Sequence, residues 1–160
     1  MTFRPALALT LFLGAVAPAP ALWAENGPDE AVELWEADRT RIFDASEVRL
    51  EDFTWIARPV VVFADTPADP RFRQQMELIE RRIEELAIRD VVVIVDTDPA
   101  ARSSVRMTLR PRGFMLALVN KEGGVFQRKP APWDVREITR SIDKLPQRQQ
   151  ELRDGTAIRG

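Results

Sequence analysis

The chain has 160 residues, 30% of them charged, a net charge of −2, and neither cysteine nor histidine. The missing residue types exclude thiol chemistry, thiolate or imidazole metal sites and a Ser-His-Asp triad, and we expect no cofactor. The interspersed charges provide neither a basic field for nucleic acid nor a polybasic membrane patch. Carboxylates, lysine, arginine and hydroxyls remain as the side chains that could bind a ligand or take part in a reaction.

Residues 1–24 have the features of a secretory signal peptide. Arg4 precedes an apolar stretch, and small residues stand before two candidate cleavage points, after Ala21 or Ala24. The apolar run is interrupted by prolines and is shorter than the roughly 20 residues that a membrane span needs. We therefore expect cleavage, no stable membrane insertion afterwards, and a periplasmic or secreted protein of single-domain size.

The segment that follows, residues 25–42, is a polar lead-in. A short helix over residues 29–37 is expected to pack loosely, with Trp35 exposed. Residues 49–57 then predict a helical turn whose aromatic residues, including Trp55, cover one end of the core.

Two buried strands joined by a helix form the centre of the predicted fold. Continuous β-branched runs over residues 59–64 and 91–95 are typical of strands buried on both faces. A helix over residues 71–88 lies between them, with Asp69 as N-cap and Pro70 at the first helical position. This order predicts parallel strands joined by a helical crossover.

A hairpin follows. Strands over residues 113–119 and 125–129 flank a turn in which Gly123 and Gly124 are expected to supply positive φ. Residues 100–112 are weakly patterned, so a short helix and a long loop remain alternatives there.

A final helix is expected to start at Trp133 or Asp134, because Glu137 follows Asp134 at capping-box spacing. Trp133 is expected to be a core or half-buried support. Pro146 is expected to end the helix, and residues 147–160 are expected to fray.

Several segments together resemble one family. They are residues 58–64 (Arg-Pro-Val-Val-Val-Phe-Ala), the strand and turn over 113–124, the helix start at 132–134 and the run over 142–151. They resemble an exported bacterial family of unknown function called DUDES. The resemblance implies a thioredoxin-like α/β fold, with a β-α-β unit, a β-hairpin and a C-terminal helix, but no established activity. It covers residues 43–151, which we take as one domain followed by a flexible tail over 152–160.

The chain departs from the thioredoxin pattern at the reactive positions. The two active-site cysteines of that pattern would fall near Pro67 and Pro70, and its cis-proline position would fall at Gly113 and Phe114. The resemblance therefore implies a redox-inactive member of this fold class.

Polar residues cluster where the two central strands are predicted to end. Open α/β sheets bind ligands beyond the carboxyl ends of their parallel strands. This rule predicts a ligand-facing rim, with no catalytic step assigned to it, made of Asp65, Thr66, Asp69, Arg71, Asp96 and Arg112.

The same residues allow other interpretations. Aspartates commonly cap helices and end strands, which is a purely structural role. Clustered carboxylates also suit Ca²⁺ or Mg²⁺, and a helix start with Arg71 and Arg73 suits an anion. A carboxylate-dependent or metal-assisted hydrolase using Asp65, Asp96 and Asp98 is the alternative enzymatic hypothesis.

We predict a binding module whose partner is a protein or a cell-envelope component. The basic, proline-rich stretch over residues 127–132 is either a contact for an acidic partner or a solvated loop. A purely structural envelope protein is a third possibility, which would show extended self-association.

Overall fold

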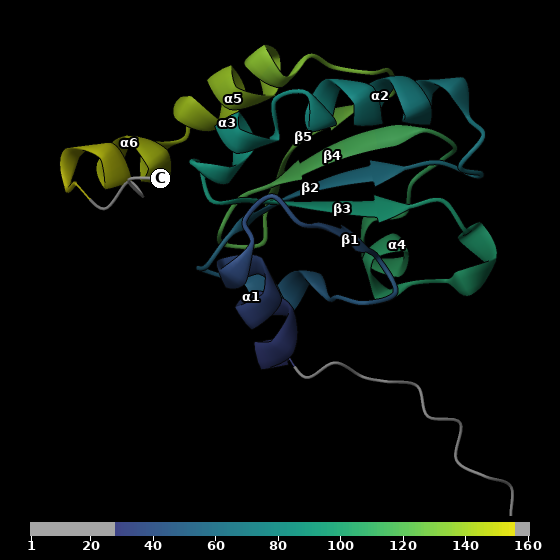
Figure 1. The fold of residues 1–160 in the computed structure, drawn as a ribbon, viewed down its shortest axis with the longest axis horizontal. Helices are drawn as coiled ribbons and strands as arrows, with labels where there is room; N and C mark the ends of the chain where they lie inside the picture. Colours follow the sequence, from purple (N-terminus) through teal and green to yellow (C-terminus); the bar gives the residue numbers. More distant parts are fainter. Residues whose placement is uncertain (1–27, 156–160) are drawn as a thin grey trace, which may run out of the picture.

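The computed structural model describes residues 28–155, so the predicted signal peptide lies outside the described residues. Five strands form one mixed sheet between two layers of helices (Figure 1). The strands are β1 (Ile42–Asp44), β2 (Arg58–Phe63), β3 (Val91–Asp96), β4 (Met115–Val119) and β5 (Val125–Lys129). Their order across the sheet is β1-β3-β2-β4-β5.

The predicted parallel pair is confirmed. Strand β2 runs parallel to β3 in a register that pairs Arg58 with Val91 and Phe63 with Asp96. On its other side β2 pairs antiparallel with β4, which forms the expected hairpin with β5. All six residues of β2 are buried, and the apolar run over residues 59–63 indicates this for every residue except Arg58.

Helices cover both faces of the sheet (Figure 1). One face is covered by α2 (Pro70–Glu80), α3 (Ile83–Ala87) and α5 (Val135–Asp143). The other face is covered by α1 (Pro28–Ala37), the 3-10 helix η1 (Leu50–Phe53) and α4 (Ser104–Leu109). The 3-10 helix η2 (Pro99–Ala101) and α6 (Pro146–Arg153) complete the described elements. Within residues 28–155, no helix combines the length and the apolar character needed to cross a membrane.

The crossover helix starts as predicted but does not continue to Ile88. Asp69 caps α2 by accepting a hydrogen bond from the Arg71 amide at 2.8 Å, and Pro70 occupies the first turn. The helix ends at Glu80, and the chain resumes as α3 after Arg82, whose φ of −139° is not helical. The prediction of one helix over residues 71–88 is therefore wrong. Neither glycine nor proline marks the break, so the local sequence does not indicate it.

The N-terminal segment is part of the core, and the expectation of loose packing is wrong. Trp35 on α1 is only 1% exposed, and its Nε1 donates to the Val91 carbonyl at 3.3 Å. It packs edge-on against Phe53. The residues after α1 add β1, a fifth strand that pairs parallel with β3.

For Trp55 the expectation of burial is wrong in the opposite sense. It was expected to cover the core, but 66% of its surface is exposed, and Phe53 fills the buried position instead. Its φ of 67° lies in the left-handed region, which bulky residues rarely adopt. Trp133 is half-buried, as expected. In the hairpin turn only Gly123 has positive φ, whereas the Gly124 amide donates to the Asn120 side chain.

The C-terminal segment does not fray within the described residues. Helix α5 starts at the predicted N-cap, Asp134, but ends at Asp143, before Pro146. Pro146 instead occupies the first turn of α6, which continues to Arg153. Proline suits this position because the first helical amides need no partner inside the helix.

Candidate functional site

The carboxyl ends of β2 and β3 carry a buried ion pair. Asp96, the last residue of β3, accepts hydrogen bonds from Arg106 Nε at 2.9 Å and Nη2 at 2.7 Å through its Oδ1 atom. Its Oδ2 atom accepts from the Ser103 hydroxyl at 2.6 Å. Arg106 Nη2 also donates to the Ala64 carbonyl at the end of β2, so one guanidinium joins both strand ends to α4.

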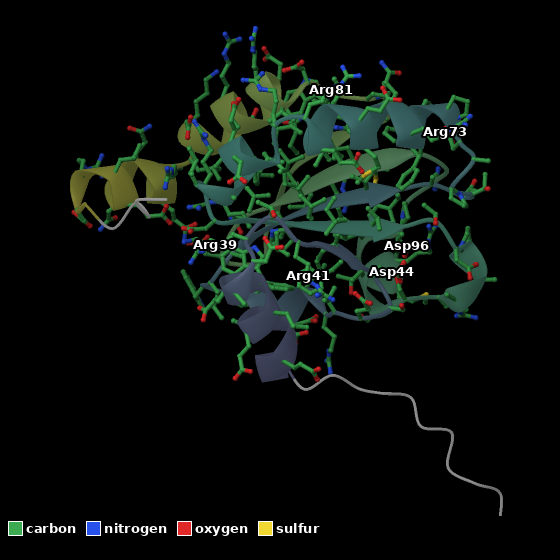
Figure 2. The ribbon with its side chains drawn as sticks, viewed as in Figure 1. Arg39, Arg41, Asp44, Arg73, Arg81 and Asp96 are labelled. Carbon is green, nitrogen blue, oxygen red and sulfur yellow. The ribbon has the colours of Figure 1, made fainter. Side chains whose placement is uncertain are left out.

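This pair is shielded from water. The Asp96 and Arg106 side chains are 3% and 10% exposed, and the guanidinium lies 5.4 Å from the Phe63 ring centre. Figure 2 places Asp96 beside α4. Because Arg106 and Ser103 occupy both oxygens of the Asp96 carboxylate, the group is committed to holding α4 against the sheet.

The start of α2 already holds a carboxylate of its own. The Asp69 side chain accepts from the Arg71 amide and is paired with the Arg71 guanidinium at 3.0 Å. The side-chain and backbone hydrogen bonds from Arg71 lower the pKa of Asp69 below its ordinary value, so it is ionised near neutral pH. An external anion would have to displace this carboxylate, which makes the helix start a poor anion site.

The predicted rim is brought together only in part. Asp65 is exposed and lies 3.9 Å from Arg106 Nη1, next to Gly113 in the loop before β4. Arg71 lies over the Phe114 ring at 5.5 Å. Thr66 accepts a weak hydrogen bond from the Ala68 amide, and Arg112 is exposed. The Thr66 carbonyl accepts from the Asp69 amide at 3.2 Å, which is a local turn contact. Among residues 28–155, Arg112 has no described contact with the other rim residues.

The aspartates do not form a cation site. Asp98, considered above with Asp65 and Asp96, caps η2 by accepting from the Ala100 amide at 2.9 Å. Within the described part of the chain, no three acidic side chains are grouped so that they could hold a metal ion. The structural role of these aspartates is therefore the one that the geometry supports.

Sequence reasoning missed Arg106. It lies in the weakly patterned stretch before β4, among other arginines that are exposed, such as Arg102 and Arg110. Only the tertiary fold distinguishes it, by placing α4 beside the strand ends. The basic stretch over residues 127–132 is partly engaged in internal contacts, since Arg128 donates to the Leu109 carbonyl and Lys129 lies 4.3 Å from the Trp133 ring.

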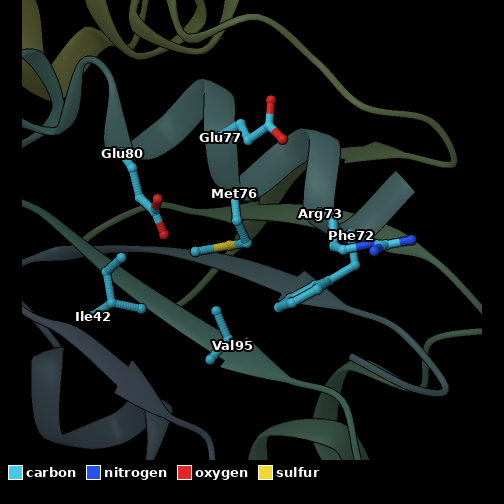
Figure 3. A pocket seen from close by; sticks show the side chains of 7 residues that line it. All are labelled: Ile42, Phe72, Arg73, Met76, Glu77, Glu80 and Val95. Carbon is cyan, nitrogen blue, oxygen red and sulfur yellow. The ribbon is translucent and has the colours of Figure 1, made fainter. Parts of the chain in front are cut away.

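A concave surface lies beside α2, at the edge of the sheet. A groove of about 520 Å³ opens there, with an apolar floor and a charged rim (Figure 3). Its floor is formed by Ile42 of β1, Val95 of β3, and Phe72 and Met76 of α2. Its rim carries Arg73, Glu77 and Glu80. The sequence pattern does not indicate this groove, because it places Ile42 in the polar lead-in.

A second charged cluster lies at the opposite end of the sheet. Arg58, at the start of β2, is fully buried and donates to Glu151 of α6 at 2.7 Å. Lys121 bonds both Glu151, at 3.1 Å, and Asp90, at 2.7 Å. Arg39 also pairs with Asp90 at 2.8 Å. These contacts explain why α6 is ordered although it has few apolar residues.

Burial and ion pairing act in opposite directions on Glu151. Burial alone would raise the pKa of its carboxyl, but the hydrogen bonds and charges of Arg58 and Lys121 outweigh burial and lower the pKa below its ordinary value. The cluster therefore favours the ionised form and anchors α6 to the sheet near neutral pH.

Comparisons with known proteins identify a family and a fold. A family model described as "Domain of unknown function (DUF4174)" matches residues 49–151. This match confirms a family of unknown function, under a name other than DUDES. The search of curated proteins finds no match.

Two solved structures from Plasmodium yoelii are similar to the chain. One is peroxiredoxin 1a, modified at its N-terminus, with 16% identity, a TM-score of 0.50, and coverage of 64% of this chain and 81% of that one. The other is thioredoxin peroxidase I, with 15% identity, the same TM-score, and coverage of 64% and 80%. At this identity the likeness shows the fold alone, and the fold is thioredoxin-like, as predicted.

Proposed function

Because the chain belongs to the family described as "Domain of unknown function (DUF4174)", which brings a fold but no activity, we propose that it is a redox-inactive binding module. Its partner is a protein or a cell-envelope component. Export by the predicted signal peptide would place it in the periplasm or outside the cell, in line with the exported bacterial family that the sequence resembles.

The first support for this proposal is the chemistry that the chain lacks. Thiol exchange and cysteine-based peroxide reduction need a thiolate, and the whole sequence has no cysteine. At the strand ends, Asp96 is bonded to Arg106 and Asp98 caps η2. Two of the three carboxylates that the hydrolase alternative requires are thus used in structural contacts, and no observation favours that alternative.

The observation that carries the proposal is the groove beside α2. Its apolar floor is half-buried, so part of the Phe72 and Met76 side chains remains accessible to solvent in the isolated chain. Covering such a surface with a partner is favourable by roughly 25 cal/mol per Å² of apolar area removed from water. The charged rim would add orientation, as polar rims do in protein interfaces.

The test is quantitative recovery of partners from an envelope fraction with immobilised chain. Wild-type protein is compared with Met76→Glu, which places a charge in the groove, and with the control Arg136→Glu on α5, which reverses an exposed charge outside the groove. A protein recovered by the wild type and the control, but not by Met76→Glu, is then purified and titrated directly.

We expect Met76→Glu to weaken that direct binding at least about tenfold, as loss of an apolar contact at an interface centre does. Equal affinities for the wild type and Met76→Glu, with both variants folded, would contradict the proposal. Cell fractionation tests the proposed export. Full-length, uncleaved chain that stays in the cytosol would contradict it.

A further inference from the structure

The rim of the groove has a charge pattern with a simple symmetry. Arg73 and Glu80 both lie on the rim of the groove and are separated by seven residues of α2. Seven residues correspond to almost two helical turns and roughly 10 Å along the axis, so both project from nearly the same side of the helix. Met76 lies between them and points into the groove (Figure 3).

Both charges lack an internal counter-ion. Within residues 28–155, Arg73 and Glu80 take part in no ion pair or side-chain hydrogen bond that the structure describes, and both residues are exposed. Glu77 differs, because its carboxylate pairs with Arg81 at 3.3 Å. An apolar centre is thus flanked by one free positive and one free negative charge.

Such a pattern is complementary to itself. In a two-fold interface the same surface meets its copy in the reverse direction, so residue i faces residue j and j faces i. If α2 packs antiparallel to a second α2 about an axis close to Met76, each Arg73 faces the Glu80 of the other copy. Each apolar floor is then covered by the other helix. A partner surface of uniform charge would attract one rim residue and repel the other.

We propose that the occupant of the groove is a second copy of this chain, an inference that rests on the proposed binding function. The two copies pair through antiparallel α2 helices, with Met76 at the centre and two Arg73 to Glu80 ion pairs at the periphery. The surface offered by one short helix and one groove is at the small end of specific interfaces. The dimer is therefore weak, with a dissociation constant in the range of about 1–100 μM, and depends on concentration.

Sedimentation velocity across a concentration series, on the protein as it is recovered from expressing cells, tests this proposal. Arg73→Glu and Glu80→Arg each place like charges opposite one another twice per dimer. We expect each to raise the dissociation constant about tenfold at low salt. The double variant Arg73→Glu with Glu80→Arg restores both pairs in the opposite sense and should return the constant to within about threefold of wild type.

Controls separate this inference from the broader function. Arg136→Glu should leave the dissociation constant unchanged, and circular dichroism should show that every variant is folded. A chain that stays monomeric at about 1 mM, or a dimer that the double variant fails to restore, would overturn the inference. If the protein is monomeric and Met76→Glu still abolishes binding of a purified envelope protein, the binding function stands and the self-association does not. If dimers form and the charge swap restores them, while no other partner depends on Met76, the self-association stands alone.

Discussion

The buried pair at the strand ends leads to the strongest stability prediction, which is that Asp96→Asn destabilises the fold. Removing one partner of a buried ion pair typically costs about 3–5 kcal/mol, because the other charge is left without compensation. Asparagine keeps one oxygen that can accept from Arg106, and Arg106 keeps its bond to the Ala64 carbonyl. We therefore expect the lower end, about 3 kcal/mol, and a fall in Tm of about 10 °C.

Urea unfolding followed by tryptophan fluorescence measures this loss, with buried Trp35 as a native-state reporter. Asp65→Asn is the matched control, because Asp65 is exposed and lies 3.9 Å from the same guanidinium. It should change the free energy of unfolding by less than about 0.5 kcal/mol.

A double variant separates the effect of an unpaired buried charge from the effect of a changed side-chain shape. Asp96→Asn with Arg106→Met removes both charges, so no buried charge is left without a partner, and that uncompensated charge is the main source of the loss. The double variant should therefore recover at least half of the loss caused by Asp96→Asn. A loss below about 1 kcal/mol for Asp96→Asn, or a double variant less stable than the single one, would show that the Asp96–Arg106 pair does not stabilise the fold in this way.

Three further predictions test other elements. Glu151→Gln should cost about 1 kcal/mol of unfolding free energy at pH 7. Since the folded pKa of Glu151 lies below its unfolded value of 4.5, this contribution is present above pH 4.5 and is lost as the pH falls through the folded pKa. A difference from wild type that persists undiminished in acid would contradict this assignment. Trp55→Gly should raise stability by about 0.5 kcal/mol in urea unfolding, because glycine relieves the left-handed backbone and the exposed ring contributes little; a loss above about 1 kcal/mol would show that the ring is structurally important. Gly113→Ala should cost about 1 kcal/mol, from its φ of 63° alone, since the nearest atom to a new Cβ is Asp65 Oδ2 at 3.8 Å; a loss above about 3 kcal/mol would indicate a steric clash.

The central strands and helix starts were predictable because local chemistry determines them. The β-branched runs of β2 and β3 are long enough to indicate strands buried on both faces, and Asp69 and Asp134 are caps followed by helical sequence. β1 escaped detection because three residues are too few to show a period.

Which tryptophan is buried depends on tertiary packing. Trp35 lies in a polar stretch, yet α1 turns it against the sheet, where its indole finds the Val91 carbonyl. Trp55 stands among apolar residues, yet the turn after η1 directs it to solvent. Neighbouring sequence carries no information about either outcome, because the covering elements are distant along the chain.

That the predicted rim binds a ligand stays a prediction, and only the location of some of its residues could be predicted. Asp65, Asp69 and Asp96 do lie at the carboxyl ends of the parallel strands, as the topology requires. Their roles follow from Arg106, which comes from α4 and has no distinguishing local pattern. The groove beside α2 needs β1 for its floor, so it could not be predicted while that strand was missing.

Recognition through the groove beside α2 can be tested by comparing two photo-crosslinking positions in living cells. One crosslinking residue replaces Met76 in the groove, and the other replaces Asp65 at the strand ends. We expect strong, specific adducts from position 76, to a second copy or to another envelope protein, and little from position 65. Specific adducts from position 65 with none from position 76 would place recognition at the strand ends and contradict this expectation.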